Sequence, residues 1–174
     1  GGFIGVYATV RVDKGQASIL ALEGSEALDR RAPPDFREEP PYPLKERLKI
    51  DRWQFRDANW SPDFSESAKK ALEFYEKEGG VAVEDIDAVL AIKTTVLEEL
   101  MKITGPFTIE GITFTPDKVT EQLEYEVEFG YDERGVPFHE RKQIIRPFFI
   151  ALMSHMKSNL FSELNNYIRL FERL

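Results

Sequence analysis

The stretch PFFIALMSHMKSNLFSELNNYIRLFERL, residues 147–174, decides how the rest of the chain can be arranged. It contains no glycine, and its one proline stands at the first position, where a missing N–H costs a helix nothing. Apolar residues recur at steps of three or four, the spacing of one helix face, and the pattern predicts a helix of roughly 40 Å. This apolar seam consists of Phe149, Met153, Met156, Leu160, Leu164, Tyr167, Phe171 and Leu174.

Further apolar residues lie off the seam, among them Phe148, Ile150 and Leu152. A sheet covers only a limited stripe of a helix, so the remaining apolar surface needs a second cover. Other helices of the domain could supply it. Because the seam continues to the end of the chain, we expect a homodimer or a protein partner bound through this helix, with Tyr167 and Phe171 as binding residues.

The composition is typical of a soluble globular protein. With 174 residues, of which 42% are hydrophobic, the chain can bury one substantial core, and we expect a single domain over residues 1–174. The lack of cysteine excludes disulfides, thiolate zinc sites and cysteine nucleophiles, and fits a cytoplasmic protein. The apolar run at residues 3–10 is too short for a membrane span, although the start without Met leaves room for a removed leader.

The net charge of -8 is concentrated in the middle of the chain. Residues 57–143 carry nine basic and twenty acidic side chains. An acidic surface repels phosphate groups, so neither nucleic acid nor a membrane is expected as a partner. Such a surface either keeps the protein in solution or binds a basic protein partner.

Hairpin and loop signals dominate the first third of the chain. Residues 3–12 and 17–23 alternate around a turn at 13–16, which predicts an antiparallel hairpin. Residues 24–43 hold five of the ten prolines and predict an extended, protease-sensitive loop. Residues 47–55 predict a third strand with a bulge or change of face near Asp51.

Two helices are predicted in the middle of the chain. Ser61, Pro62 and Asp63 form a helix start, and the apolar spacing that follows ends at Gly79 and Gly80. Residues 83–103 carry apolar side chains at helical intervals before Gly105 and Pro106, although residues 88–92 alone also fit a buried strand.

Strand signals return after these helices. Residues 107–110 and 112–114 flank Gly111, a bulge or tight bend, and residues 115–117 open a short helical turn. Residues 124–131 alternate between aromatic or aliphatic side chains and glutamates, a turn follows at 132–135, and residues 136–145 complete a second hairpin. We therefore expect an α+β fold: a mainly antiparallel sheet built from hairpins, two middle helices and a long C-terminal helix packed on one sheet face.

Glu124, Glu126 and Glu128 would form a row on this second hairpin, about 7 Å apart at two strand rises. Such a row could bind a hard cation or serve a glycosidase, although the solvated face of a strand explains it equally. His139 would lie opposite the row, as a site residue or a surface ion partner. We expect no metal and no cofactor, because the sequence lacks a histidine ligand set, a phosphate loop and a serine elbow.

The sequence favours a non-enzymatic protein-binding or interaction domain that uses its acidic surface, its C-terminal amphipathic helix, or both. The alternative is a hydrolase or small-ligand-binding domain with a carboxylate site near Glu126, Glu128 and His139. A third possibility is an architectural domain of a larger protein. The candidate binding residues are Glu124, Glu126, Glu128, His139, Tyr167 and Phe171.

Overall fold

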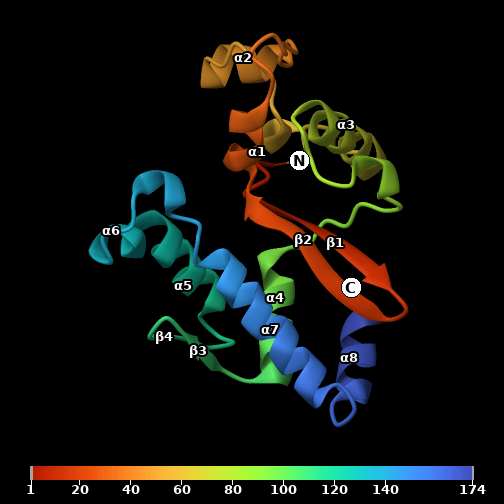
Figure 1. Cartoon of the computed structure of the whole chain (residues 1–174), viewed down its shortest axis with the longest axis vertical. Helices are drawn as coiled ribbons and strands as arrows, with labels where there is room; N and C mark the ends of the chain where they lie inside the picture. The colour runs from red at the N-terminus through yellow and green to blue at the C-terminus, as the bar shows by residue number, and fades with distance from the viewer. Residues whose placement is uncertain (1, 174) are drawn as a thin grey trace. The chain divides into compact units, whose positions relative to one another are not determined.

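The computed structural model describes residues 2–173 and has an α+β fold (Figure 1). Its chain divides into two compact units, Gly1–Val89 and Leu90–Leu174, each described by itself below. Two compact units can belong to one domain, so the single-domain assignment stays a prediction. The sheet is smaller than predicted: within the described residues, β-structure consists of two separate two-stranded antiparallel sheets, one in each unit.

The first unit begins with the predicted hairpin, formed by β1 (Val6–Asp13) and β2 (Gln16–Gly24). Lys14 and Gly15 both have positive φ, which is the conformation of a two-residue type I′ turn. This turn matches the right-handed twist of the strands, so a short local sequence was enough to predict the hairpin. The register shifts between Thr9 and Val10, as at a β-bulge.

The prediction of an extended loop at residues 24–43 is wrong at both ends of this segment, where the chain is helical. Residues 25–31 form α1 (Ser25–Arg31), with Glu26 in its first turn and Arg30 and Arg31 in its last, the charges that suit a helix dipole. α2 (Tyr42–Leu48) begins at the end of the proline segment, because Pro43 is tolerated in a first helical turn. The predicted third strand at 47–55 is also wrong: α2 runs to Leu48, and Phe55–Asp57 forms a 3-10 turn, η1.

The first middle helix is confirmed as α3 (Phe64–Lys77). Asp63 caps it by accepting a hydrogen bond of 2.8 Å from the backbone N–H of Ser65. Gly79 follows the helix with a φ of +81°, the left-handed conformation that commonly ends a helix. A 3-10 turn, η2 (Val83–Asp85), lies near the end of this unit.

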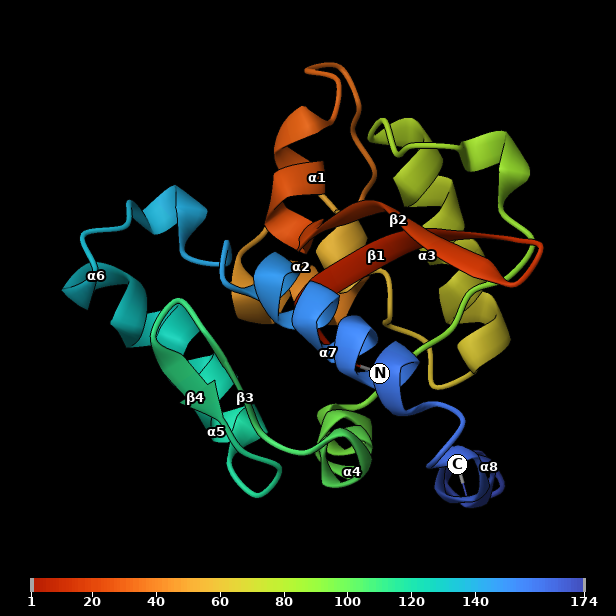
Figure 2. The same cartoon turned by 60° about the horizontal axis from the view of Figure 1, so that its bottom comes forward.

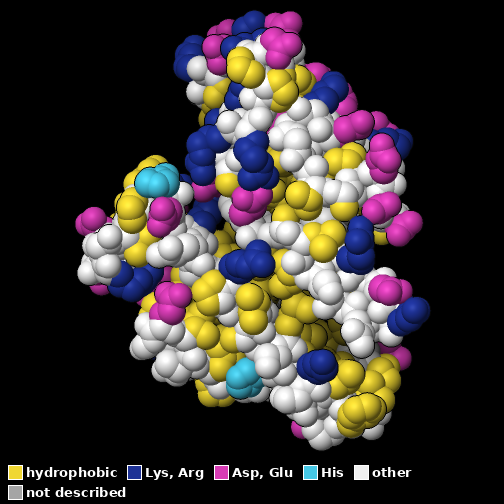
Figure 3. Space-filling view, in the orientation of Figure 1, with side chains coloured by type: hydrophobic (Ala, Val, Ile, Leu, Met, Phe, Trp, Pro, Cys, Tyr) yellow, Lys and Arg dark blue, Asp and Glu magenta, His cyan; other side chains and the backbone are white. Residues whose placement is uncertain are grey.

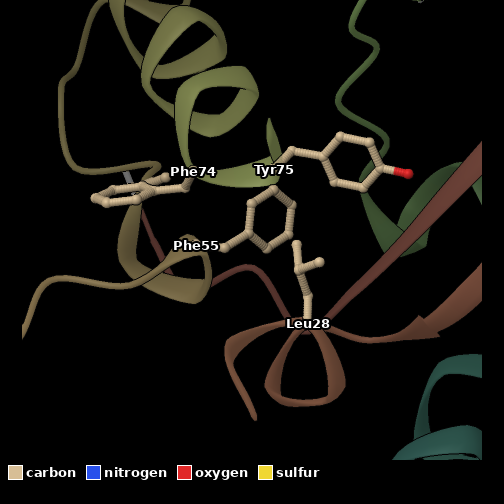
Figure 4. Packing of buried hydrophobic residues seen from close by; sticks show 5 residues of the cluster. Leu28, Phe55, Phe74 and Tyr75 are labelled. Atoms are coloured by element: carbon tan, nitrogen blue, oxygen red, sulfur yellow. The ribbon is translucent and has the colours of Figure 1, made fainter. Parts of the chain in front are cut away.

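Aromatic rings fill the core of the first unit. Phe55, Phe74 and Tyr75 are buried together with Leu28 of α1, and Figure 4 shows these four side chains gathered between α1, η1 and α3. The Tyr75 hydroxyl lies 2.6 Å from Oγ1 of Thr9, donates to the Val81 carbonyl and accepts from the Val81 N–H. Burial of the Leu28 side chain, which stabilises by about 2 kcal/mol, holds residues 25–31 against this core.

The proline segment between α1 and α2 is held against α3. The carboxylate of Glu38 lies 3.1 Å from Nζ of Lys70 and 3.6 Å from Nζ of Lys77. The Glu38 carbonyl accepts from the Trp53 N–H, and the Phe36 ring meets the Phe74 ring edge-on. These contacts fix a segment that the sequence predicted to be a loop free of the core.

The second unit begins with α4 (Thr94–Thr104), shorter than the predicted helix at 83–103. The helix starts at the two threonines and ends at Gly105 as expected, whereas residues 86–93 are not helical. β3 (Phe107–Ile109) and β4 (Ile112–Phe114) then form a hairpin around Glu110 and Gly111. The helical turn predicted after Asp117 is present as α5 (Val119–Tyr125).

The predicted hairpin at residues 124–145 is wrong. After α5 the chain continues through a π-helical segment, η3 (Glu126–Gly130), and a short helix, α6 (Tyr131–Glu133). Residues 136–145 contain a 3-10 turn, η4 (Phe138–Glu140), in place of a strand. Val127 is buried as expected, but Tyr125 and Phe129 are exposed and Glu126 is buried, so the predicted faces do not exist.

The C-terminal stretch forms two helices, α7 (Ile145–Asn159) and α8 (Leu164–Phe171), where one was predicted (Figure 2). Phe148 of α7 packs against Phe107 and Phe114 of the β3–β4 hairpin, with ring centroids 5.3 and 5.1 Å apart. The predicted packing of the last long helix on a sheet face is therefore confirmed for α7. No helix among residues 2–173 is long and apolar enough to cross a membrane.

Candidate functional site

The apolar side chains of α8 divide into a buried half and an exposed half. Tyr167 and Leu170 are buried in the second unit. Leu164, Ile168 and Phe171 are 46%, 46% and 62% exposed. Their spacing of four and three residues places them on one face of the helix, so α8 carries an uncharged apolar stripe beside its buried side.

Hydrogen bonds fix the orientation of α8. The Tyr167 hydroxyl donates to Oδ1 of Asn159 at 2.8 Å, and Nδ2 of Asn159 donates to the Ile103 carbonyl at 3.2 Å. Burial raises the pKa of the Tyr167 hydroxyl, so this group remains a hydrogen-bond donor at neutral pH. The ends of α4 and α7 thus hold the buried half of α8 in place, and the stripe of Leu164, Ile168 and Phe171 stays outward.

The turn that leads into α8 adds two more exposed apolar side chains. Leu160 is 41% exposed and Phe161 is 94% exposed. Figure 3 shows hydrophobic side chains gathered over the region of α8. Surface patches of this kind are typical of protein interfaces, because isolated chains rarely leave large apolar side chains in water close together.

The structure spreads the three predicted glutamates around a helical segment. Glu124 and Glu128 are exposed, whereas Glu126 is buried and forms an ion pair with Arg134. The predicted row of these carboxylates, about 7 Å apart, required a β-strand. The prediction is wrong because the segment is helical. His139 lies in η4, where it is exposed, with Nε2 placed 3.4 Å from the carboxylate of Glu140. A binding role for these four residues stays a prediction.

A shallow hollow of about 400 Å³ lies beside Glu126 in the second unit. It is lined by Ile112, Lys118, Glu121, Gln122, Tyr125 and Glu126. Gln122 already bonds the backbone of Thr113 and Thr115, and the Glu126 carboxylate is neutralised by Arg134. Residues 2–173 contain no group of three or more His, Asp and Glu side chains that could hold a metal ion.

Residues 1–127 match the family described as "Protein of unknown function (DUF4012)". The chain belongs to the DUF4012 family. Neither the curated proteins nor the solved structures contain a match. The matched residues of this DUF4012 chain include all of the first unit and end at Val127, so α7 and α8 follow the matched region.

Tyr167 and Phe171, both predicted as binding residues of the DUF4012 chain, have opposite environments. Tyr167 belongs to the core of the second unit, and Phe171 belongs to the exposed stripe. The sequence missed Ile168, which lies off the predicted seam although it stands four residues after Leu164. It also missed the buried carboxyl groups of Asp29 and Glu78, for which no local pattern gives a signal.

Proposed function

We propose that this DUF4012 chain is a non-enzymatic interaction domain that pairs with a second copy of itself through α8. The observation that carries the proposal is the exposed stripe of Leu164, Ile168 and Phe171 on a helix whose other apolar side chains are buried. Covering this stripe removes apolar surface from water, which is the main driving force of association.

The stripe is complementary to itself. When two copies of α8 lie antiparallel about a two-fold axis, Leu164 of one copy faces Phe171 of the other, and the two Ile168 side chains meet on the axis. Asn165 and Glu172 border the same edge of the stripe, so the amide of one copy can donate to the carboxylate of the other. Arg169 stands about 100° around the helix from Ile168, beyond Asn165 and Glu172 and turned away from the second copy, so no like charges are brought together.

The available area indicates a weak dimer. Five exposed side chains, those of Leu160, Phe161, Leu164, Ile168 and Phe171, offer on the order of 500 Å² per copy. Two copies then approach the lower end of specific interfaces, about 1,200 Å² in total. We therefore expect a reversible dimer whose population rises with protein concentration.

Other candidate functions have less support. The acidic residues of 57–143 are divided between the two units, and an acidic contact surface is supported by the charge count alone. The predicted carboxylate site near Glu126, Glu128 and His139 depended on a strand, but residues 126–130 are helical. Glu126 is also paired with Arg134.

Sedimentation velocity over a concentration series tests the proposal with Ile168→Glu. Two carboxylates would meet on the two-fold axis, so the variant should remain monomeric where the wild type dimerises. Arg169→Glu changes the charge of the next residue, which lies outside the stripe, and should dimerise like the wild type. Persistent dimerisation of Ile168→Glu, or a wild type that is monomeric at millimolar concentration, would exclude pairing through α8.

A charge-swapped mixture identifies the second copy as the partner. Ile168→Glu and Ile168→Lys should each be monomeric, but together they should form a heterodimer because opposite charges then meet at the axis. A heterodimer in the mixture, held by the retained apolar contacts and this ion pair, would support self-pairing. No heterodimer in the mixture, with a dimeric wild type, would show that Ile168 does not meet itself.

We also propose a cytoplasmic location for the domain. The chain has no cysteine, so it requires no oxidising compartment to complete its fold. Fractionation of the native host, with detection of the endogenous protein, tests this location. Recovery outside the cytoplasmic fraction would contradict it.

A further inference from the structure

The first unit buries two carboxyl groups from distant parts of the chain. Asp29 belongs to α1 and is 3% exposed, and Glu78 caps the C-terminal end of α3 and is fully buried. Oε1 of Glu78 accepts from the backbone N–H of Phe55 at 3.3 Å. Oδ1 of Asp29 accepts from the backbone N–H of Arg56 at 3.4 Å. Both carboxyl groups therefore hold the same short segment, η1.

Each carboxyl group also has one buried oxygen that lacks a hydrogen-bond partner in the described part of the chain. Neither Oδ2 of Asp29 nor Oε2 of Glu78 receives a hydrogen bond from an N–H group or hydroxyl within residues 2–173. The negative charge of Asp29 acts on Glu78, and a proton held by one of the two groups would allow the other to accept a hydrogen bond from it. Two carboxylates cannot form such a bond, because both are acceptors, so the bond requires a proton on one of the two groups.

The charges around the pair show which group carries it. Nε of Arg56 lies 3.5 Å from Oδ2 of Asp29 and 3.7 Å from the carboxylate of Asp57. Arg52 donates to the Asp29 carbonyl at 3.3 Å, and its charge also acts on Glu78. Two guanidinium groups thus face three carboxyl groups. The charges balance when Asp29 and Asp57 are ionised and Glu78 is protonated.

We propose that Asp29 and Glu78 form a pH-responsive latch, in which one shared proton holds α1 and η1 on the end of α3 and its loss to water releases them. The closed latch keeps Leu28 and Phe55 in the core, because these residues stand beside Asp29 and the Glu78-bonded N–H. Loss of the proton leaves two buried like charges, which repel one another across a poorly solvated space.

The pH range follows from the properties of Glu78. Burial, followed by the negative charge of Asp29, raises the pKa of Glu78 to about 8. Burial also raises the pKa of Asp29, against the lowering effect of Arg56, and burial raises the pKa of Asp57. An unfolded glutamate has a pKa of about 4.3, so the folded state binds the extra proton between these values. Stability should fall as the pH rises from about 4.3 to about 8.

Glu78→Gln imitates the closed latch. Its amide can donate to Asp29 and accept from the Phe55 N–H, but it cannot lose a proton at these pH values. In urea unfolding, wild type and Glu78→Gln should have similar midpoints at pH 5, and the variant should have the higher midpoint at pH 9. Glu76→Gln, at an exposed position of α3, should follow the wild type at every pH. Parallel curves for wild type and Glu78→Gln would overturn the proposal.

Two further measurements locate the effect. Hydrogen exchange should show the amides of α1 losing protection between pH 7 and 9 in the wild type but not in Glu78→Gln, after correction for the intrinsic pH dependence of exchange. NMR titration of the Glu78 side-chain carbon should give a midpoint near pH 8, and Asp29→Asn should lower that midpoint by removing the neighbouring charge. A wild-type midpoint near pH 4, or α1 amides that exchange alike in both proteins, would disprove the latch.

Discussion

At the scale of single residues, Glu126 acquires its role from a contact eight positions along the chain. Its carboxylate pairs with Arg134, and its side chain is 10% exposed. Gly130 leaves the space for this pair, because a Cβ at that position would collide with Oε2 of Glu126. The segment from Glu126 to Arg134 is therefore a local structural unit, held by a largely buried ion pair and a residue without a side chain.

Replacement of Glu126 by alanine should destabilise the protein by about 1–3 kcal/mol, because it leaves the Arg134 guanidinium without its partner in a partly buried place. Glu124→Ala and Glu128→Ala remove exposed carboxylates from the same segment and should each change the free energy of unfolding by less than about 0.5 kcal/mol. Urea denaturation compares the three variants. Equal losses for all three would mean that the ion pair contributes nothing.

At the scale of secondary structure, elements marked by turn and cap residues are predicted more reliably than elements marked only by an alternating pattern. The glycine of the first turn, the Asp63 cap and Gly79 act within a few residues, so the β1–β2 hairpin and α3 could be predicted. The alternation at 124–131 predicts a strand wrongly, because a period of two indicates a strand only when a partner strand can pair with it. Pro137 and the 3-10 turn after it remove that partner.

The β3–β4 hairpin offers a test of turn chemistry. Glu110 and Gly111 have φ values of +49° and +81°, as a type I′ turn requires. Glutamate is strained at positive φ, whereas asparagine tolerates it, so Glu110→Asn should stabilise the protein by about 0.5–1 kcal/mol. Glu110→Val should destabilise it, because branching at Cβ increases the strain. Thermal unfolding of both variants measures the difference, and shifts of the same sign would contradict a type I′ turn.

At the scale of the whole molecule, the candidate sites depend on contacts between distant segments. The sequence placed Tyr167 and Phe171 on one apolar seam, but only the packing of α8 determines which side chain is buried. Asp29 and Glu78 come from separate elements, and each resembles an ordinary surface acid in the sequence. The α+β class and the packing of α7 on a hairpin can be predicted from the hydrophobic pattern of the sequence. The apolar stripe of α8 and the pair of Asp29 and Glu78 can be identified only in the folded chain.

The division into two units predicts where a protease cuts first. Leu90 and Ile92 are 83% and 68% exposed in the non-helical stretch before α4. Thermolysin cleaves on the N-terminal side of large apolar residues, and proteases need several residues of accessible, extensible backbone. We expect the first cut before Leu90 or Ile92, with two fragments that persist as folded units, detected by mass spectrometry.

The proline segment at 24–43 is the competing site, and its composition alone favours it. However, the burial of Leu28, the ion pairs of Glu38 with Lys70 and Lys77, and the ring of Phe36 on Phe74 oppose the local unfolding that cleavage requires. Replacing both Leu90 and Ile92 by serine should slow the first cut without lowering the thermal stability, since neither side chain is buried. An unchanged cleavage rate in that variant, or a first fragment ending within 24–43, would show that composition governs accessibility more than these contacts do.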